Sequence, residues 1–223
     1  MNQTSSSATP DASSPPASCS GGLELVKWAA FAAMLADHVD LILLGRSVPE
    51  LHAIGRFALP AFAVAFGIGL ARTSDLLHVA CRLVAPAFLA AFAWAAVHPL
   101  PYVNVLVTFF LGAMIVAAFQ YHAAAGLLIG LLTWLAGPDL EGGSPAVFLV
   151  VGAWAAVTWR SPWPALATAA PWLAFALSPG VVLGLLAPWA ARYASIRLPR
   201  HPGLLLWAYP AHIAALGAVR ALA

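Results

Sequence analysis

Charged residues are scarce in this 223-residue chain: they make up 8% of it, against 62% apolar residues. An ordinary soluble domain carries about 25% charged residues. Two long stretches, from Leu83 to Pro138 and from Ser161 to Ala191, contain no Asp, Glu, Lys or Arg. Because no solvated helix face can be drawn in them, they must contact lipid or other lipid-embedded helices. The composition therefore excludes a water-soluble fold and predicts an integral membrane protein whose first partner is the lipid bilayer.

Cysteines and clustered basic residues are also few. The two cysteines, Cys19 and Cys81, lie far apart, which excludes a disulfide framework and a cysteine zinc site. Ten basic residues are spread thinly for a net charge of +2, without the basic stripe that phosphate-backbone binding requires. The HExxH, GxSxG, Walker A and GxGxxG patterns are absent. We therefore expect no metal and no nucleic-acid partner.

The chain divides into a polar tail and an apolar remainder. Residues 1–22 are rich in Ser, Pro and Ala and are predicted to be a disordered cytoplasmic tail. Residues 23–223 are predicted to be a transmembrane helical domain, since a span needs about 20 apolar residues. The expected fold is an all-α, polytopic integral membrane helical bundle of about nine transmembrane helices, with eight to ten possible, over 23–44, 53–71, 76–97, 102–119, 123–136, 145–159, 162–177, 179–191 and 202–220.

Two features bear on the topology. Five prolines interrupt the apolar run 161–191, which predicts either two short spans or a broken span with a re-entrant piece. The positive-inside rule favours a multi-pass arrangement with a cytoplasmic N-terminus. That orientation puts Arg46 and the acidic turn at Glu141 outside, and on the inside it puts Lys27, Arg72, Arg160, Arg192, Arg197 and Arg200.

The first predicted helix carries charge where a bilayer disfavours it. Asp37, His38 and Asp40 fall well inside the span, at a cost of about 2.5–3.5 kcal/mol for each charged group at the bilayer centre. Lys27 precedes His38 by eleven residues, so the two share a helix face about 16 Å apart along the axis. Either these groups form a site, or Asp37 and His38 are an internal polar pair and Lys27 snorkels to the interface.

A carboxylate beside an imidazole raises its basicity and fixes its orientation, as a general base requires. Adjacent helical residues point about 100° apart, however, which predicts poor contact between Asp37 and His38. In the second predicted helix, Pro60 frees the carbonyl of Arg56 and kinks the helix beside a buried cation. Arg56 either pairs with Asp37 or Asp40, or faces a bound anion.

Polar residues in later helices complete the candidates. Asn104 and Thr108 share a helix face and are expected to form interhelical hydrogen bonds. Gly67 and Gly69 are expected to permit close helix contact. His212, in the last predicted helix, is either a helix-bonding residue or part of a site.

An ordered series of residues runs through the chain after position 22: Lys27, Asp37-His38, Gly55-Arg56 with Pro60 and Phe62, Gly69 with Thr73, Arg82, Asn104-Val-Leu-Val-Thr108 with Gly112, and Tyr209-Pro210-Ala211-His212. This series resembles the TraX family, membrane proteins linked to N-terminal acetylation of conjugative pilin. In addition, Lys27-x10-His38 is similar to the basic-x10-His motif of the transmembrane acyltransferase-three family.

The resemblance implies an acetyltransferase that uses acetyl-CoA as cosubstrate and acetylates an amine or hydroxyl of a peptide, saccharide or other small acceptor. His38 would be the general base or would accept the acetyl group transiently, and Asp37 or Asp40 would orient it. Lys27 and Arg72 or Arg82 would hold the CoA phosphates, and Arg56 or His212 would stabilise the oxyanion. The candidate residues are catalytic His38 and Asp37, cofactor-binding Lys27, Arg56 and Arg82, and further site residues Asp40, Asn104, Tyr209 and His212.

Two other functions fit the same residues. A small proton-coupled transporter or channel would use Asp37, His38, Asp40, Arg56 and His212 as a proton relay. A structural membrane subunit would use them only for helix association.

Overall fold

The computed structural model describes residues 21–97, 103–137, 140–175, 178–194 and 203–223. In these residues the regular secondary structure is entirely helical, and an isolated bridge between Val103 and Leu140 adds no strand. The predicted all-α fold is confirmed. The helices are α1 (Gly21–Ile42), α2 (Pro49–Gly55), α3 (Ala58–Leu70), α4 (Leu76–Val97), α5 (Val105–Tyr121), α6 (Ala123–Leu135), α7 (Gly143–Thr158), α8 (Trp163–Phe175), α9 (Pro179–Ala191) and α10 (Leu204–Leu222).

The observed helices agree closely with the predicted ranges, apart from the second predicted helix. The predicted helix 53–71 begins earlier and is divided into α2 and α3 at Arg56 and Phe57, where Pro60 cannot donate to the Arg56 carbonyl. The break is the predicted kink, but Arg56 is exposed there and not buried as expected. The proline-rich run forms two short helices, α8 and α9, which was one of the two alternatives.

The predicted tail 1–22 lies outside the described residues except for its last two. Gly21 and Gly22 are buried and form the first turn of α1. Gly22 lies directly against the backbone of Ala191 at the end of α9, so a side chain at this position would push the two helices apart. The start of α1 and the end of α9 are therefore at the same end of the molecule.

Three helical stretches in the described part of the chain are long and apolar enough to cross a membrane. They are Pro49–Leu70, which comprises α2 and α3, together with α4 and α10. Helices α5, α6, α7 and α9 are apolar but shorter, at 13 to 17 residues. Helix α1 is as long as α4, but it carries the four charged residues Glu24, Lys27, Asp37 and Asp40.

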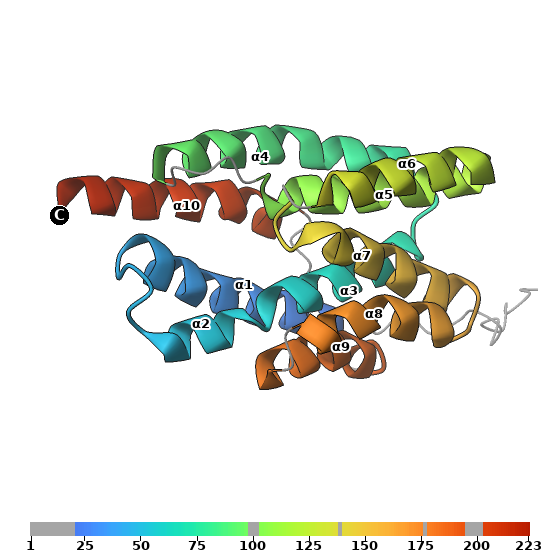
Figure 1. Ribbon diagram of the computed structural model, residues 1–223, viewed down its shortest axis with the longest axis horizontal. Helices are drawn as coiled ribbons and strands as arrows, with labels where there is room; N and C mark the ends of the chain where they lie inside the picture. Colours follow the sequence, from blue (N-terminus) through green and yellow to red (C-terminus); the bar gives the residue numbers. More distant parts are fainter. Residues whose placement is uncertain (1–20, 98–102, 138–139, 176–177, 195–202) are drawn as a thin grey trace, which may run out of the picture.

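Helices α4, α5, α6 and α10 lie roughly along the long axis of the molecule (Figure 1). Helix α10 runs beside α4 in the same direction, and Arg220 near its end donates to the carbonyl of Val97 at the end of α4. Helix α5 runs back along the other half of α4. It begins halfway along α4, because Asn104, its N-cap, donates its side-chain amide to the Ala87 carbonyl at 2.9 Å.

Helix α7 also begins in the middle of the bundle. The backbone amide of Glu141, two residues before α7, donates to the Val103 carbonyl just before α5 at 2.8 Å. Two helix N-termini therefore meet inside the molecule. The first amides of a helix have no acceptor within the helix itself, so the region favours an acidic side chain or an anion.

Close packing of α3, α5 and α7 surrounds this region. The backbone of Val150 in α7 lies directly against Gly67 of α3, and the Val150 side chain contacts Gly112 of α5. A side chain at either glycine would collide with Val150, so the predicted packing role of Gly67 is confirmed. Gly69 differs, because a Cβ built there meets nothing within 4 Å.

Candidate functional site

A pair of histidines lies at the contact between α1 and α10. The Nδ1 atom of His38 is 2.6 Å from the Nε2 atom of His212, and His38 is 3% exposed. The ring planes differ by 7°, and the centroids are 4.9 Å apart. The distance between the centroids exceeds the N···N distance by about one ring diameter, so the two nitrogens lie on the line that joins the centroids. The two nearly parallel rings therefore lie edge to edge in one plane. Because the lone pair of an imidazole nitrogen also lies in the ring plane, this is the geometry of a direct N–H···N hydrogen bond.

Aromatic rings surround this histidine pair. Trp94 of α4 meets the His38 ring edge to face at 5.2 Å between centroids, and Tyr209 of α10 does so at 6.2 Å. Phe31 of α1 contacts His212 in the same way at 5.5 Å. These contacts hold both imidazoles in fixed orientations, which is what a general base needs.

A directed chain of hydrogen bonds begins beside the pair. Trp94 Nε1 donates to the Tyr209 hydroxyl at 3.2 Å, and that hydroxyl donates to Glu141 Oε2 at 3.0 Å. The same carboxylate oxygen accepts the Val105 amide, in the first turn of α5, at 2.7 Å. Glu141 thus pairs an otherwise unsatisfied amide of α5 and interacts favourably with the positive end of the helix dipole.

Glu141 is the main residue that sequence reasoning missed, since it was assigned only to an outer turn. Its carboxylate instead joins Tyr209 to the start of α5 inside the molecule. The sequence feature that could have indicated Glu141 is the scarcity of acidic residues in this part of the chain. Asp139 and Glu141 are the only acidic residues between Asp75 and the C-terminus. Two glycines directly follow Glu141, at the start of an apolar helix.

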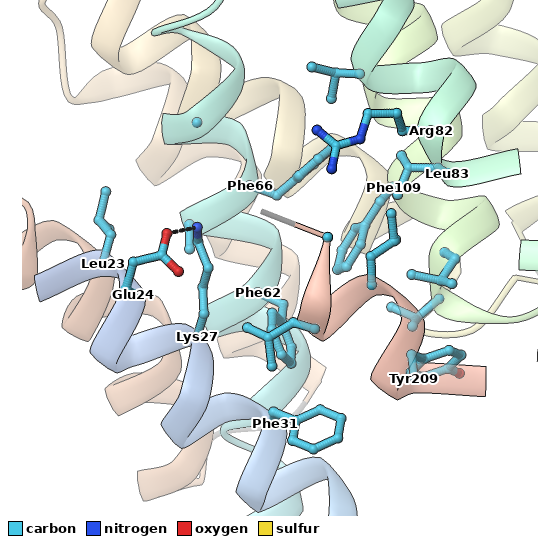
Figure 2. Close-up of a pocket in the computed structure, with 18 of the residues that line it drawn as sticks. Leu23, Glu24, Lys27, Phe31, Phe62, Phe66, Arg82, Leu83, Phe109 and Tyr209 are labelled. Atoms are coloured by element: carbon cyan, nitrogen blue, oxygen red, sulfur yellow. Dashed lines mark hydrogen bonds and ion pairs between the residues drawn. The ribbon is translucent and has the colours of Figure 1, made fainter. Parts of the chain in front are cut away.

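A first cavity of about 490 Å³ opens between α1, α3, α4, α5 and α10. Its charged residues are Glu24, Lys27, Arg72 and Arg82, and its apolar wall includes Phe31, Phe62, Phe66 and Phe109. Figure 2 shows Lys27 and Arg82 on opposite sides of the cavity, with Phe31 and Tyr209 toward its other end. The first cavity therefore leads from cations to the tyrosine beside the histidine pair.

The cations of the first cavity come from three helix ends. Lys27 Nζ forms an ion pair with Glu24 Oε1 at 2.6 Å within the first turns of α1. The Arg82 guanidinium lies beside Gly203, the residue before α10. Gly203 has φ +95, a left-handed conformation that favours glycine. Arg72 follows the end of α3 and lines the same cavity.

A second cavity, of about 530 Å³, lies toward the other end of α1. Met34, Phe62 and Val105 line both cavities and so separate them. Arg56 lines the second cavity and is absent from the wall of the first, so the structure does not group it with Lys27 and Arg82. The charged and titratable residues around the second cavity are Asp37, Arg46, His52, Arg56 and Glu141.

Asp37 points away from its neighbour His38. Its Oδ1 atom accepts from Arg46 Nη1 at 2.5 Å and lies 2.9 Å from His52 Nδ1. The backbone at Gly55 fits directly against its side chain. The expectation of poor contact with His38 is confirmed, and the partner that orients His38 comes from α10 instead.

The side chains of Asp40 and Asn104 form hydrogen bonds with backbone groups. Asp40 is fully buried, and its Oδ1 atom accepts from the Val48 amide at 2.9 Å, which fixes the turn between α1 and α2. Its Oδ2 atom has no partner among the described residues. Asn104 caps α5 and bonds to α4, and Thr108 Oγ1 donates to the Glu141 carbonyl at 3.1 Å. The expected interhelical hydrogen bond of Asn104 is confirmed.

The structure thus separates the predicted site residues into three groups. His38, Tyr209 and His212 meet at one point, beside the first cavity with Lys27 and Arg82. Asp37 and Arg56 belong to the second cavity. Asp40 and Asn104 shape the backbone between them.

In the described part of the chain, apolar helices, three of them in stretches long enough to cross a membrane, surround an internal cluster of histidine, tyrosine and glutamate. A family model described as TraX protein matches residues 22–220. The chain therefore belongs to the TraX family, as its motifs indicated. Neither the curated proteins nor the solved structures include a significant match to it.

Proposed function

We propose that this protein is an integral-membrane acetyltransferase that transfers an acetyl group from acetyl-CoA to an amine or hydroxyl. One observation carries the proposal: the first cavity connects a cationic rim to the immediate surroundings of a buried, hydrogen-bonded histidine. Acetyl-CoA has the matching shape, with phosphates at one end and a thioester at the end of a long arm. The axial distance of about 16 Å between Lys27 and His38 is comparable to the extended arm.

The donor would be held by residues that already line the cavity. Lys27, Arg72 and Arg82 would bind the phosphates, while the phenylalanine wall contacts the pantetheine arm. The thioester would then lie toward Tyr209. The first cavity has the volume of an ordinary ligand pocket, for which about 300–1,000 Å³ is typical.

The chemical step uses His38 as the general base. Its imidazole takes a proton from the acceptor amine or hydroxyl as the acceptor attacks the thioester carbonyl. A carbon–nitrogen or carbon–oxygen bond forms, the carbon–sulfur bond breaks, and the CoA thiolate receives the proton from the imidazolium. Binding next to His38 brings the two reactants together, which supplies much of the rate.

The acceptor would be an amine or hydroxyl of a peptide or other small molecule. Membership of the TraX family favours the N-terminus of a pilin subunit. The second cavity is a suitable place for such a group, because it approaches the same central region from the opposite end of α1. Arg56 is exposed there, and its guanidinium suits a carboxylate or another anionic group of the acceptor.

The proposal places a polytopic helical bundle in the bacterial inner membrane with the N-terminus in the cytoplasm. The distribution of cations supports this orientation. Lys27 and Arg72 lie at the end of the molecule where α1 starts and α3 finishes, and Arg192 follows α9 at that same end. Arg46 lies at the far end of α1. Acetyl-CoA would enter the first cavity from the cytoplasmic side.

Incubation of the purified protein with radiolabelled acetyl-CoA and candidate acceptors tests the function. The expected result is a labelled peptide or small-molecule acceptor whose formation requires the protein. Peptides with a pilin-like free N-terminus, the same peptides blocked at the amine, and saccharides form the acceptor set. Proton flux through reconstituted liposomes without acyl-CoA, combined with no labelled product, would overturn the proposal in favour of a transporter.

Lys27→Ala is expected to raise the KM for acetyl-CoA about tenfold, which corresponds to about 1.4 kcal/mol. The turnover at saturation should change little, because a phosphate contact remote from the thioester contributes mostly uniform binding. Steady-state kinetics over a range of salt concentrations provides the measurement, since salt screens the contact. Lys27→Arg should restore part of the affinity because it keeps the charge.

Glu24→Gln is the matched control for Lys27. It removes the ion-pair partner of the lysine and leaves its positive charge available to phosphate. The KM for acetyl-CoA should therefore stay the same or fall. An unaltered KM in Lys27→Ala would mean that this lysine only snorkels to the interface.

Gly69→Leu is expected to weaken acetyl-CoA binding at least tenfold without a loss of thermal stability. Gly69 lines the first cavity, and a Cβ atom built there meets no neighbouring atom within 4 Å. Leucine would fill donor space without displacing a helix, and it favours helix over glycine by roughly 0.5–1 kcal/mol. Titration of acetyl-CoA against the purified variant, with its melting temperature, provides the measurement.

Gly67→Leu, two residues earlier, is the control that distinguishes filling of the cavity from a loss of protein stability. Its side chain would collide with the backbone of Val150, so this variant should lose stability first. Wild-type acetyl-CoA affinity in a folded Gly69→Leu variant would place the donor outside the first cavity.

A further inference from the structure

We infer that His212 is a positioning residue that fixes the tautomer of His38 and so leaves His38 Nε2 as the basic atom. This inference rests on the proposed function for its catalytic meaning. The positions that it assigns to two hydrogens, one on each histidine ring, do not depend on that function.

His212 Nδ1 is 3.0 Å from the carbonyl oxygen of Ala208, one turn earlier in α10. A carbonyl oxygen only accepts hydrogen bonds, so the Nδ1 atom of His212 must carry a hydrogen. A neutral imidazole has one N–H group, which leaves the Nε2 atom of His212 with a free lone pair. That lone pair lies in the ring plane, toward His38.

The geometry at His38 completes the assignment. His38 Nδ1 lies 2.6 Å from His212 Nε2, with the two rings edge to edge in nearly one plane. Because His212 Nε2 only accepts in the neutral pair, His38 Nδ1 must donate. The neutral His38 ring then has no hydrogen on Nε2, and this nitrogen is free to take a proton from an acceptor.

The arrangement assigns to a neutral histidine the role that a carboxylate has in other catalytic pairs. A carboxylate partner would add a full negative charge at this buried position, whereas an imidazole holds the same tautomer without it. The adjacent carboxylate, Asp37, is paired with Arg46 and His52 instead. When His38 is protonated during turnover, both ring nitrogens carry hydrogen, and the bond to His212 Nε2 remains to stabilise the imidazolium.

Two variants of His212 test this role. His212→Phe keeps a ring beside Phe31 but removes the acceptor, so kcat should fall about 100-fold or more with an unchanged KM for acetyl-CoA. His212→Gln places a side-chain oxygen where it can accept from His38 Nδ1. It should recover at least tenfold of that loss, a rescue that a purely steric role would not give.

Nitrogen NMR of the full-length protein labelled with 15N-histidine in lipid bilayers provides the direct readout. His38 should carry hydrogen on Nδ1 and none on Nε2, with its signals assigned by their loss in His38→Asn. His212→Gln should keep this tautomer, and His212→Phe should change it. A hydrogen on His38 Nε2 in the wild-type protein would overturn the inference, even where the phenylalanine variant does not fold.

The two measurements separate this inference from the proposed function. If the wild-type protein transfers no acetyl group, the acetyltransferase proposal fails while the NMR result still decides the tautomer. If the protein is active but both His212 variants keep the wild-type kcat, His212 does not position His38.

Discussion

His38→Asn is expected to lower the kcat for acetyl transfer by about 10²–10⁴, the range that general bases contribute. The asparagine amide nitrogen can take the place of His38 Nδ1 and donate to His212 Nε2, so the contact with α10 survives. The variant has no basic atom in place of Nε2. The expected result is therefore a folded protein that binds acetyl-CoA with unchanged affinity and turns it over slowly, as measured by single-turnover kinetics with radiolabelled acetyl-CoA.

His38→Ala would test the same point less cleanly. It removes the bond to His212 and the ring contacts with Trp94 and Tyr209, so lost stability would add to lost chemistry. His122→Asn is the matched control, because His122 is exposed between α5 and α6. Near wild-type turnover in His38→Asn would show that His38 is structural and would remove the proposed mechanism.

Much of the fold could be predicted because hydropathy and proline act locally. Runs of apolar residues determine where helices lie in a membrane protein, and most predicted segments coincide with observed helices within a few residues. Pro60 divides the second predicted helix through one missing donor. Asn104 was predicted inside a helix but begins α5 as its N-cap, because its side chain accepts the Leu106 amide at 3.0 Å.

The partners of the polar residues could not be predicted in the same way. Asp37 and His38 are adjacent, yet the helical turn between them sends one side chain to Arg46 and the other to His212, which is 174 residues away. A buried polar group must find a partner, but sequence alone does not tell which distant helix supplies it. Arg56 illustrates the same limit, since its cavity is lined by residues from α1, α3 and α8, which are far apart in the sequence.

Glu141→Ala is expected to destabilise the protein and disturb the site together. The carboxylate accepts hydrogen bonds from the Val105 amide and the Tyr209 hydroxyl. Its removal leaves two donors unpaired inside the bundle, at a cost of about 1–3 kcal/mol each. The melting temperature of the purified variant should fall by several degrees. The kcat should also fall, because Tyr209 packs beside the His38 ring.

Glu141→Gln distinguishes a hydrogen-bond acceptor from a negative charge. One carboxylate oxygen, Oε2, accepts both bonds, and the carbonyl oxygen of glutamine can do the same. If acceptor geometry is what matters, the glutamine variant keeps the wild-type melting temperature and activity. If it loses as much as Glu141→Ala, the charge at the start of α5 is the stabilising feature. A Glu141→Ala variant with wild-type stability would show that the start of α5 does not depend on this carboxylate, and Tyr209 would then need another acceptor to hold its place beside the histidine pair.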